Sequence, residues 1–313
     1  MGDKAPEWLA TDVQGIARAA DLLRSGRLVA VPTETVYGLA ARANSEQAVA
    51  EVFRAKRRPD FNPLIVHVPS LAAGRELARF DASAELLAER FWPGPLTLVL
   101  PSQPGSGIVP AVTAGLATIA LRMPAHPATL ALLEQTGLPL AAPSANRSGG
   151  VSPTTPQHVA QSLGPAVSAI LDGGPCARGL ESSIVALRED GSWHLLRQGP
   201  ITEEGLVALL GAPAPLSDAR IEAPGQLARH YSPGKPLRLG VSQASDDEFL
   251  VGFGLIEGDC SLSRRGDLAE AAARLYACLH EAAASDKPRI AVAPVPQDGI
   301  GAALNDRLQR AAA

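Results

Sequence analysis

Helix-like and strand-like segments alternate along the first two thirds of this chain. Apolar side chains three or four positions apart predict helices, and short continuous apolar runs predict buried strands. The predicted helices cover residues 13–23, 45–55, 83–91, 127–136 and 155–163. The predicted strands cover residues 28–31, 64–68, 97–101, 117–121, 138–142, 169–171, 183–187 and 193–196. Because the two types alternate, we expect an α/β fold.

The pattern changes after a predicted helix that ends near Gly211. Residues 212–236 (APAPLSDARIEAPGQLARHYSPGKP) hold five prolines and little apolar periodicity, which is typical of a linker. Beyond it, strands are predicted at 237–241, 249–253 and 289–293, with a long alanine-rich helix at 268–284. We therefore predict a catalytic domain at 1–205, a linker at 206–235 and a small α/β domain at 236–313.

Composition and charge exclude several classes of protein. The chain has 313 residues, 46% of them hydrophobic, which is enough for two folded domains. Its net charge of −4 argues against a protein that coats nucleic acid or a membrane surface, so any anion site must be local. Arginine supplies most of the cations, and the only lysines are Lys4, Lys56, Lys235 and Lys287. A lysine inside a motif is therefore notable.

The cysteines and the N-terminal segment indicate the compartment. Cys176, Cys260 and Cys278 are widely spaced and form neither a disulfide framework nor a CxxC pair. The first residues lack a basic segment followed by an apolar one, and there is no run of 18 apolar residues. We expect a cytoplasmic protein that does not enter a membrane.

Polar residues follow several predicted strands directly. Thr33, Arg122, Ser144 with Asn146, and Arg197 all lie just past a strand. In open α/β sheets ligands bind at the carboxyl ends of strands, so these residues predict a binding site. Taken singly each has an ordinary alternative, since Arg122 suits either a surface salt bridge or a bound carboxylate, and the Ser144 loop suits a simple turn.

The run from Lys56 to Arg58 is the one dense cationic cluster in the first 200 residues. It fits a solvated helix end, where cations interact favourably with the helix dipole, or a phosphate site. The rare lysine and the rigid PDFNP segment at 59–63 favour phosphate. By contrast, His67 and the sequence Glu181-Ser182-Ser183 are weak signals taken alone.

Familiar catalytic signatures are missing from the sequence. It contains no GxxxxGK[ST], GxGxxG, HExxH or GxSxG pattern and no paired-cysteine zinc motif. We therefore expect chemistry without a nucleophile from the protein.

Eight segments, in order and at compatible spacing, resemble the YrdC-like family. They are PTETVYGL (32–39), KRRPDFNPLIVH (56–67), FWPGPLTLVL, RMPAHP (122–127), APSANRSGGVSPT, ILDGGP, GLESSIV and LLRQGPIT. The linker sequence APG (223–225) followed by RHYSPG (229–234), and the ending GIGAALNDRLQRA, are similar to the long two-domain threonylcarbamoyl-AMP synthases of that family. The second domain is shorter than this form usually carries.

The resemblance implies a YrdC-like fold, a twisted mixed sheet with helices and a concave positive face, followed by a smaller Rossmann-like α/β domain. It also implies a reaction in which L-threonine, bicarbonate or CO2, and ATP with Mg²⁺ give threonylcarbamoyl-AMP and pyrophosphate. A tRNA threonylcarbamoyl-transfer machinery is the implied partner, with at most a weak direct contact to tRNA.

The resemblance also implies roles for individual residues. Those carried over for ATP are Lys56, Arg58, Thr118, Ser144, Asn146, Ser152, Arg197, His230 and Tyr231, with Lys56 and Arg58 as the catalytic pair. Those carried over for L-threonine are Thr33, His67, Arg122, Ala142 and Ser182. His230 and Tyr231 are expected to close over the site as a lid supported by the second domain.

Two other functions were considered. One is a carbamoyl-adenylating enzyme that acts on carbamoyl phosphate, which the two-domain layout disfavours. The other is a non-enzymatic RNA-binding or ribosome-maturation protein, which the net charge and the lack of interleaved aromatic and basic residues disfavour.

Overall fold

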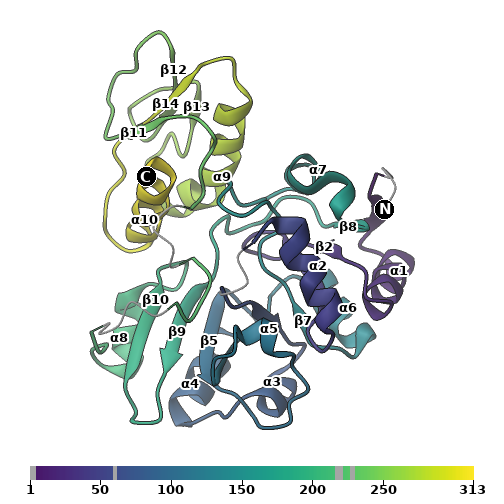
Figure 1. The fold of residues 1–313 in the computed structure, drawn as a ribbon. Helices are drawn as coiled ribbons and strands as arrows, with labels where there is room; N and C mark the ends of the chain where they lie inside the picture. Colours follow the sequence, from purple (N-terminus) through teal and green to yellow (C-terminus); the bar gives the residue numbers. More distant parts are fainter. Residues whose placement is uncertain (1–4, 59–61, 216–220, 226–229) are drawn as a thin grey trace.

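The chain forms two α/β domains, shown in Figure 1 in a computed structural model. The structure describes residues 5–58, 62–215, 221–225 and 230–313. Part of the predicted phosphate turn, Pro59 to Phe61, and Arg229 of the linker motif lie outside these residues. The first domain occupies the lower part of the view, and the second, in green and yellow, lies above it (Figure 1).

A ten-stranded mixed sheet is the frame of the first domain, with strand order β1-β8-β2-β3-β7-β4-β6-β5-β9-β10. Its strands are β1 (Glu7–Ala10), β2 (Val29–Val31), β3 (Gly38–Arg42), β4 (Ile65–His67), β5 (Leu96–Pro101), β6 (Thr118–Arg122), β7 (Leu140–Ala141), β8 (Ala169–Asp172), β9 (Ser183–Leu187) and β10 (Trp193–Arg197). Its helices are α1 (Val13–Arg24), α2 (Glu46–Lys56), α3 (Leu71–Leu77), α4 (Ala82–Phe91), α5 (Pro110–Thr113), α6 (Pro127–Thr136), α7 (Pro156–Leu163), a 3-10 turn at Gly164–Ala166, and α8 (Glu203–Leu210). The predicted mixed α/β fold is confirmed.

Side-chain caps explain where several helices begin. Ser45, Asp81 and Thr155 each accept a hydrogen bond from the backbone amide three residues later, which satisfies a free amide of the first turn. Helix α6 has the predicted bounds, and α7 ends as predicted at Leu163 but begins at Pro156, directly after its cap Thr155. The first helix is capped by Asp12 rather than by the predicted Thr11, because the Asp12 carboxylate accepts from the Gly15 amide at 2.8 Å.

Helices cover the sheet unevenly. At the β1–β3 end, alternate strand residues face opposite helix layers: Val29 and Val31 pack with α1 and α6, whereas Ala30 packs in the main core with α2. At the β4–β9 end, one face packs against that main core. The other face holds a small apolar cluster that includes Ile65, Val99 and Ala223 of the linker. The linker therefore lies where a helix layer would otherwise be.

The second domain has a four-stranded parallel sheet of strand order β11-β14-β12-β13. Its elements are β11 (Leu237–Leu239), β12 (Glu248–Gly252), β13 (Cys260–Ser261), α9 (Leu268–Ala284), β14 (Arg289–Val292) and α10 (Ile300–Ala312). Its parallel strands and helices fit the Rossmann-like expectation. Helix α10 lies on the side of this domain nearest the first one (Figure 1).

The predicted boundary at residue 205 falls inside α8. Leu206 is buried in the core of the first domain and Leu210 packs against that core, so the helix belongs to this domain. The two domains also share an apolar cluster, since Val36 and Leu180 of the first domain pack with α9 and α10 residues. Gly179 permits this close approach: a Cβ there would lie 2.4 Å from the Ala272 carbonyl oxygen.

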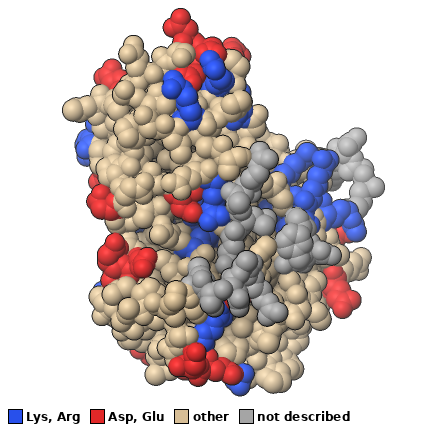
Figure 2. All heavy atoms as spheres, turned by 60° about the vertical axis from the view of Figure 1, so that its left-hand side comes forward, with Lys and Arg blue, Asp and Glu red and all other residues tan. Residues whose placement is uncertain are grey.

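Charges are mixed on the molecular surface. Figure 2 shows basic and acidic side chains interspersed on one face, with no continuous basic surface on that face. Among the described residues, no helix is both long and apolar enough to cross a lipid bilayer.

Candidate functional site

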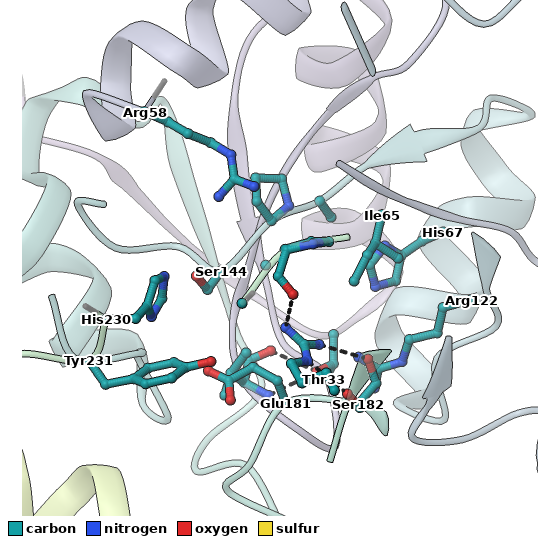
Figure 3. A pocket seen from close by; sticks show the side chains of 17 residues that line it. Thr33, Arg58, Ile65, His67, Arg122, Ser144, Glu181, Ser182, His230 and Tyr231 are labelled. Carbon is teal, nitrogen blue, oxygen red and sulfur yellow. Dashed lines mark hydrogen bonds between the residues drawn. The ribbon is translucent and has the colours of Figure 1, made fainter. Parts of the chain in front are cut away.

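A cavity lies over the β4–β6–β9 part of the sheet and under the linker (Figure 3). Ten of the fourteen sequence-predicted site residues line it: Thr33, Arg58, His67, Arg122, Ala142, Ser144, Ser182, Arg197, His230 and Tyr231. Only about 50 Å³ of it is open, enough for a few water molecules. The cavity is therefore closed in this conformation.

Arg122 and His67 form one end of the cavity. They are paired residues on the adjacent parallel strands β4 and β6. The Arg122 Nε donates to the Gly94 carbonyl at 3.1 Å, and its Nη2 donates to the Glu34 carboxylate. Glu34 also accepts from the Ala125 amide at 2.9 Å, so the guanidinium is held on two sides. The structure thus places Arg122 in the site with a buried ion pair.

His67 is uncharged in this environment. Burial and the nearby Arg122 guanidinium lower the pKa of His67 to about 3, despite the opposing effect of Glu34. Its Nδ1 is buried and has no hydrogen-bond partner among the described residues. A neutral imidazole with a free ring nitrogen is suited to a polar ligand.

Thr33 and Ala142 complete this end through local backbone geometry. The Thr33 hydroxyl donates to the Val36 carbonyl at 2.7 Å and accepts from the Val36 amide at 3.2 Å, which closes a tight turn after β2. The Ala142 amide donates to the carbonyl of Ile65, the first residue of β4, at 3.0 Å. Both residues are therefore fixed by the strands that carry the polar side chains.

Arg197 and Ser182 join the base of the cavity to the linker. Arg197 donates through Nε and Nη2 to the carbonyl and hydroxyl of Ser182, at 3.0 and 3.1 Å. Its Nη1 donates to the Pro224 carbonyl at 3.3 Å. A Cβ at Gly225 would lie 2.8 Å from the Arg197 Cδ, so glycine is required for this approach. The arginine thus anchors the linker on the site.

Lys56 and Arg58 hold different positions. Arg58 lines the cavity and is oriented by the Asn62 and Pro63 carbonyls, at 3.3 and 3.1 Å. Lys56 is buried at the end of α2 and does not line the cavity; its amine donates to the carbonyls of Ser144 and Asn146. Burial and the Arg58 charge lower the pKa of Lys56. In this conformation Lys56 holds the loop rather than facing the cavity.

The loop that Lys56 holds, Ser144–Asn146, carries a second buried polar side chain. Asn146 is buried, and its Nδ2 donates to the Arg147 and Gly150 carbonyls at 2.9 Å. Its Oδ1 is buried without a partner among the described residues. Although Asn146 does not line the cavity, its free acceptor belongs to the loop that brings Ser144 there.

Two predicted residues lie further from the cavity. Ser152 is buried behind it, and its hydroxyl donates to the Glu181 carboxylate at 2.5 Å. Thr118 begins β6, whereas Arg122 ends it, and Thr118 lines a separate hollow with Arg188 and Asp190. The cavity does not include Thr118, because a strand carries its first and last residues to opposite edges of the sheet.

His230 and Tyr231 enter the cavity from the linker, opposite Arg122 in Figure 3. The Ser232 amide donates to the Gly149 carbonyl at 2.8 Å, which ties this segment to the first domain. Burial together with the positive charges nearby lowers the pKa of His230 to about 3, despite the effect of Glu181. Tyr231 is 1% exposed and its hydroxyl points toward Glu181.

Two carboxylates of the site are not among the predicted site residues: Glu34 was not singled out, and Glu181 gave only a weak signal in sequence. Glu34 lies within the PTETVYGL segment and Glu181 within GLESSIV, so the motifs that carried the resemblance contained both. Burial alone would raise the pKa of Glu181, but Arg307, Arg197 and the hydroxyls of Ser152 and Tyr276 lower it to about 2. Glu181 is therefore ionised inside the protein.

Comparisons with known proteins found related families, proteins and structures. Residues 21–199 match the Sua5/YciO/YrdC family, described as "Telomere recombination", and residues 201–313 match the "Threonylcarbamoyl-AMP synthase, C-terminal domain". The chain is 39% identical to a threonylcarbamoyl-AMP synthase of Bacillus subtilis, over 97% of this chain and 94% of that protein. A crystal structure of Pyrococcus abyssi Sua5 complexed with L-threonine superposes with a TM-score of 0.89 at 35% identity, covering 99% of this chain and 98% of that one.

Proposed function

This chain belongs to the Sua5/YrdC family of threonylcarbamoyl-AMP synthases, and on that premise we propose how its cavity performs the reaction. The substrates are L-threonine, bicarbonate or CO2, and ATP. The neutral threonine amine attacks the carbon of CO2, with release of a proton, or of bicarbonate, with release of water, to form a carbamate. A carbamate oxygen then attacks the α-phosphorus of ATP, and pyrophosphate leaves. Threonylcarbamoyl-AMP is the product.

Threonine binds at the Arg122 end of the cavity. The guanidinium is already oriented by Gly94 and Glu34, so it can receive the carboxylate of the amino acid without reordering. The unpartnered Nδ1 of His67 and the turn at Thr33 lie at the same end. Ser182 and the Ala142 backbone complete the surroundings of the amino acid.

ATP binds at the opposite end, where Arg58, Ser144, Arg197 and the linker converge. Two arginines are suited to a triphosphate, because each guanidinium donates a rigid fork of hydrogen bonds to phosphate oxygens. Lys56 would reach this end once its amine leaves the carbonyls of Ser144 and Asn146 and donates to phosphate oxygens instead. Asn146 belongs to the same loop, whereas Ser152 binds Glu181 behind the cavity. Thr118 lines a separate hollow, so it would contact ATP only in a rearranged site.

The protein's own contribution is alignment and electrostatic stabilisation. Arg58 and Arg197 would stabilise the negative charge that builds up on the phosphates, in a cavity with little open space. Mg²⁺ would arrive with the ATP phosphates, since the described residues hold no group of three or more His, Cys, Asp or Glu suited to a metal ion. Glu181 is already engaged by Ser152, Tyr276 and Arg307.

The linker acts as a lid in this proposal. The open space of about 50 Å³ is too small for a nucleotide, so His230 and Tyr231 must move away for ATP to enter. Their return would protect a product that water can hydrolyse. The product then passes to a tRNA threonylcarbamoyl-transfer machinery, and the mixed surface charge supports at most a weak direct contact with tRNA.

The observation that carries the proposal is the pairing of His67 with Arg122 at one end of a cavity whose other end is cationic. The test is pyrophosphate release by the purified chain from ATP and bicarbonate, with and without L-threonine. Threonine-dependent release, with threonylcarbamoyl-AMP detected by mass spectrometry, is the expected result. Release that ignores threonine, or that requires carbamoyl phosphate, would overturn it in favour of a carbamoyl-adenylating enzyme.

A further inference from the structure

Arg307 of the second domain is completely buried, although it lies on a helix outside the catalytic domain. From α10 its side chain crosses to the first domain. Its Nε donates to the Glu181 carboxylate at 3.0 Å, and its Nη2 donates to the Gln198 carbonyl at 2.7 Å. A buried guanidinium needs such partners, and here the first domain supplies two of them.

Tyr276 of the second domain reaches the same carboxylate from α9. Its hydroxyl donates to Glu181 Oε2 at 2.8 Å. Its ring also stacks on the lid residue Tyr231, with ring centroids 5.5 Å apart and planes 29° from parallel. The Arg307 guanidinium lies 5.3 Å from the centre of the Tyr231 ring, within cation–π range.

These contacts flank the nucleotide end of the cavity. Gln198 directly follows Arg197, so Arg307 holds the backbone beside a cavity-lining residue of that end. Arg307 also contacts the ring of Tyr231, the lid residue that lines the same end of the cavity. By comparison, the hydrogen bonds of Arg307 and Tyr276 reach neither Arg122 nor His67.

We infer that Arg307 and Tyr276 are positioning residues for the nucleotide, through which the second domain holds Tyr231 and Arg197 in a binding-competent arrangement. This inference rests on the proposed function and gives the second domain a defined role within it. Neither side chain touches the reactants; both act through Glu181, Gln198 and the lid.

The backbone of Tyr231 supports this role. Its φ of +64° is left-handed, a conformation that a bulky residue adopts only when its surroundings impose it. Ring contacts with Tyr276 and Arg307 and the backbone bonds of Ser232 and His230 supply that constraint. Once these ring contacts are lost, we expect Tyr231 to relax to ordinary backbone angles and leave the cavity.

Two conservative variants test the inference in the full-length chain. Arg307→Lys keeps the charge but loses the forked contacts to Glu181 and Gln198, and Tyr276→Phe loses one hydrogen bond while keeping the ring. Arg289→Lys is the matched control, because Arg289 is an exposed arginine of the same domain paired with Asp247. The readouts are KM for ATP, kcat, the Kd of threonine measured without ATP, and the melting temperature.

We expect KM for ATP to rise about tenfold in Arg307→Lys and a few-fold in Tyr276→Phe, while threonine Kd stays within about twofold of wild type. The control should match wild type in all four readouts. A merely structural interface would instead lower the melting temperature and affect both ligands alike. That result, or an unchanged KM for ATP, would overturn the inference.

Failure of the positioning role can be distinguished from failure of the proposed function. If the wild-type chain shows no threonine-dependent pyrophosphate release, the proposed function fails. If the wild type is active and the folded variants keep its KM for ATP, only the positioning role fails. Should Arg307→Lys not fold, Tyr276→Phe decides alone, because it removes a single oxygen atom from the interface.

Discussion

The Arg122 guanidinium and the Glu34 carboxylate form an ion pair in which both side chains are nearly buried, 5% and 12% exposed. In the proposed function, threonine and Glu34 would share this one guanidinium. Since Glu34 also accepts from the Ala125 amide, it fixes the direction in which Arg122 faces the cavity.

Glu34→Gln should therefore weaken threonine binding. Loss of the charge-assisted bond leaves the guanidinium free to turn, and we expect KM for threonine to rise about tenfold with little change in KM for ATP. Steady-state kinetics with each substrate varied in turn will measure this. Glu85→Gln, which breaks an exposed pair with Arg75, is the control. A lowered KM for threonine would mean that Glu34 competes with the substrate instead.

Lys56→Met tests the cationic motif. We expect turnover to fall at least about a hundredfold, because the rare lysine supports the nucleotide loop and supplies charge to the phosphates. Stability should change by no more than about 1 kcal/mol, since relief of a buried ammonium offsets two carbonyls left without a donor. Urea unfolding and pyrophosphate release measure the two effects. Retained turnover would remove Lys56 from the site.

Glu181 should make stability depend on pH in the acid range. In the folded chain its pKa is about 2, below the ordinary 4.5, so the unfolded chain binds its proton first. The corresponding stabilisation is full above pH 4.5 and is lost as the pH falls toward 2, by about 3 kcal/mol. Urea unfolding between pH 2 and 5 should show a shallower slope for Glu181→Gln than for wild type. Glu257→Gln, at an exposed loop, should keep the wild-type slope, and equal slopes for all three proteins would refute the assignment.

Tyr231→Ala tests the lid. Without the ring, the linker loses its contacts with Tyr276 and Arg307, and the cavity opens to water. We expect faster release or hydrolysis of threonylcarbamoyl-AMP, measured by following free product and AMP over time. Product that persists as long as with wild type would contradict a closing role.

Local signals were sufficient to predict much of the fold. Helices such as α7 have a capping residue, a regular apolar stripe and a glycine at the end, all visible in sequence. Strand β3 was not predicted, because its residues Gly38–Arg42 follow Pro32 in a segment that reads as a loop. Helix α10 was also missed, since its N-terminus has no side-chain cap.

The candidate site was predictable where chemistry follows a strand, as at Thr33, Arg122 and Arg197. Side chains that act through other groups could not be found in this way. Lys56 reads as a phosphate ligand in sequence, whereas the fold turns its amine to two carbonyls. Arg307 lies far along the chain from Glu181, and only packing of the two domains brings them together.

The pairing of His67 with Arg122 has a consequence for how this chain tolerates changes in length. Strand β4 has only three residues, and side chains alternate between the two faces of a sheet. Deleting or adding one residue within β4 or β6 would turn one of the two side chains away from the cavity. The Gly- and Pro-rich loop at residues 102–109 carries no such requirement, so length variation among functional versions of this chain should accumulate there and be excluded from the two strands.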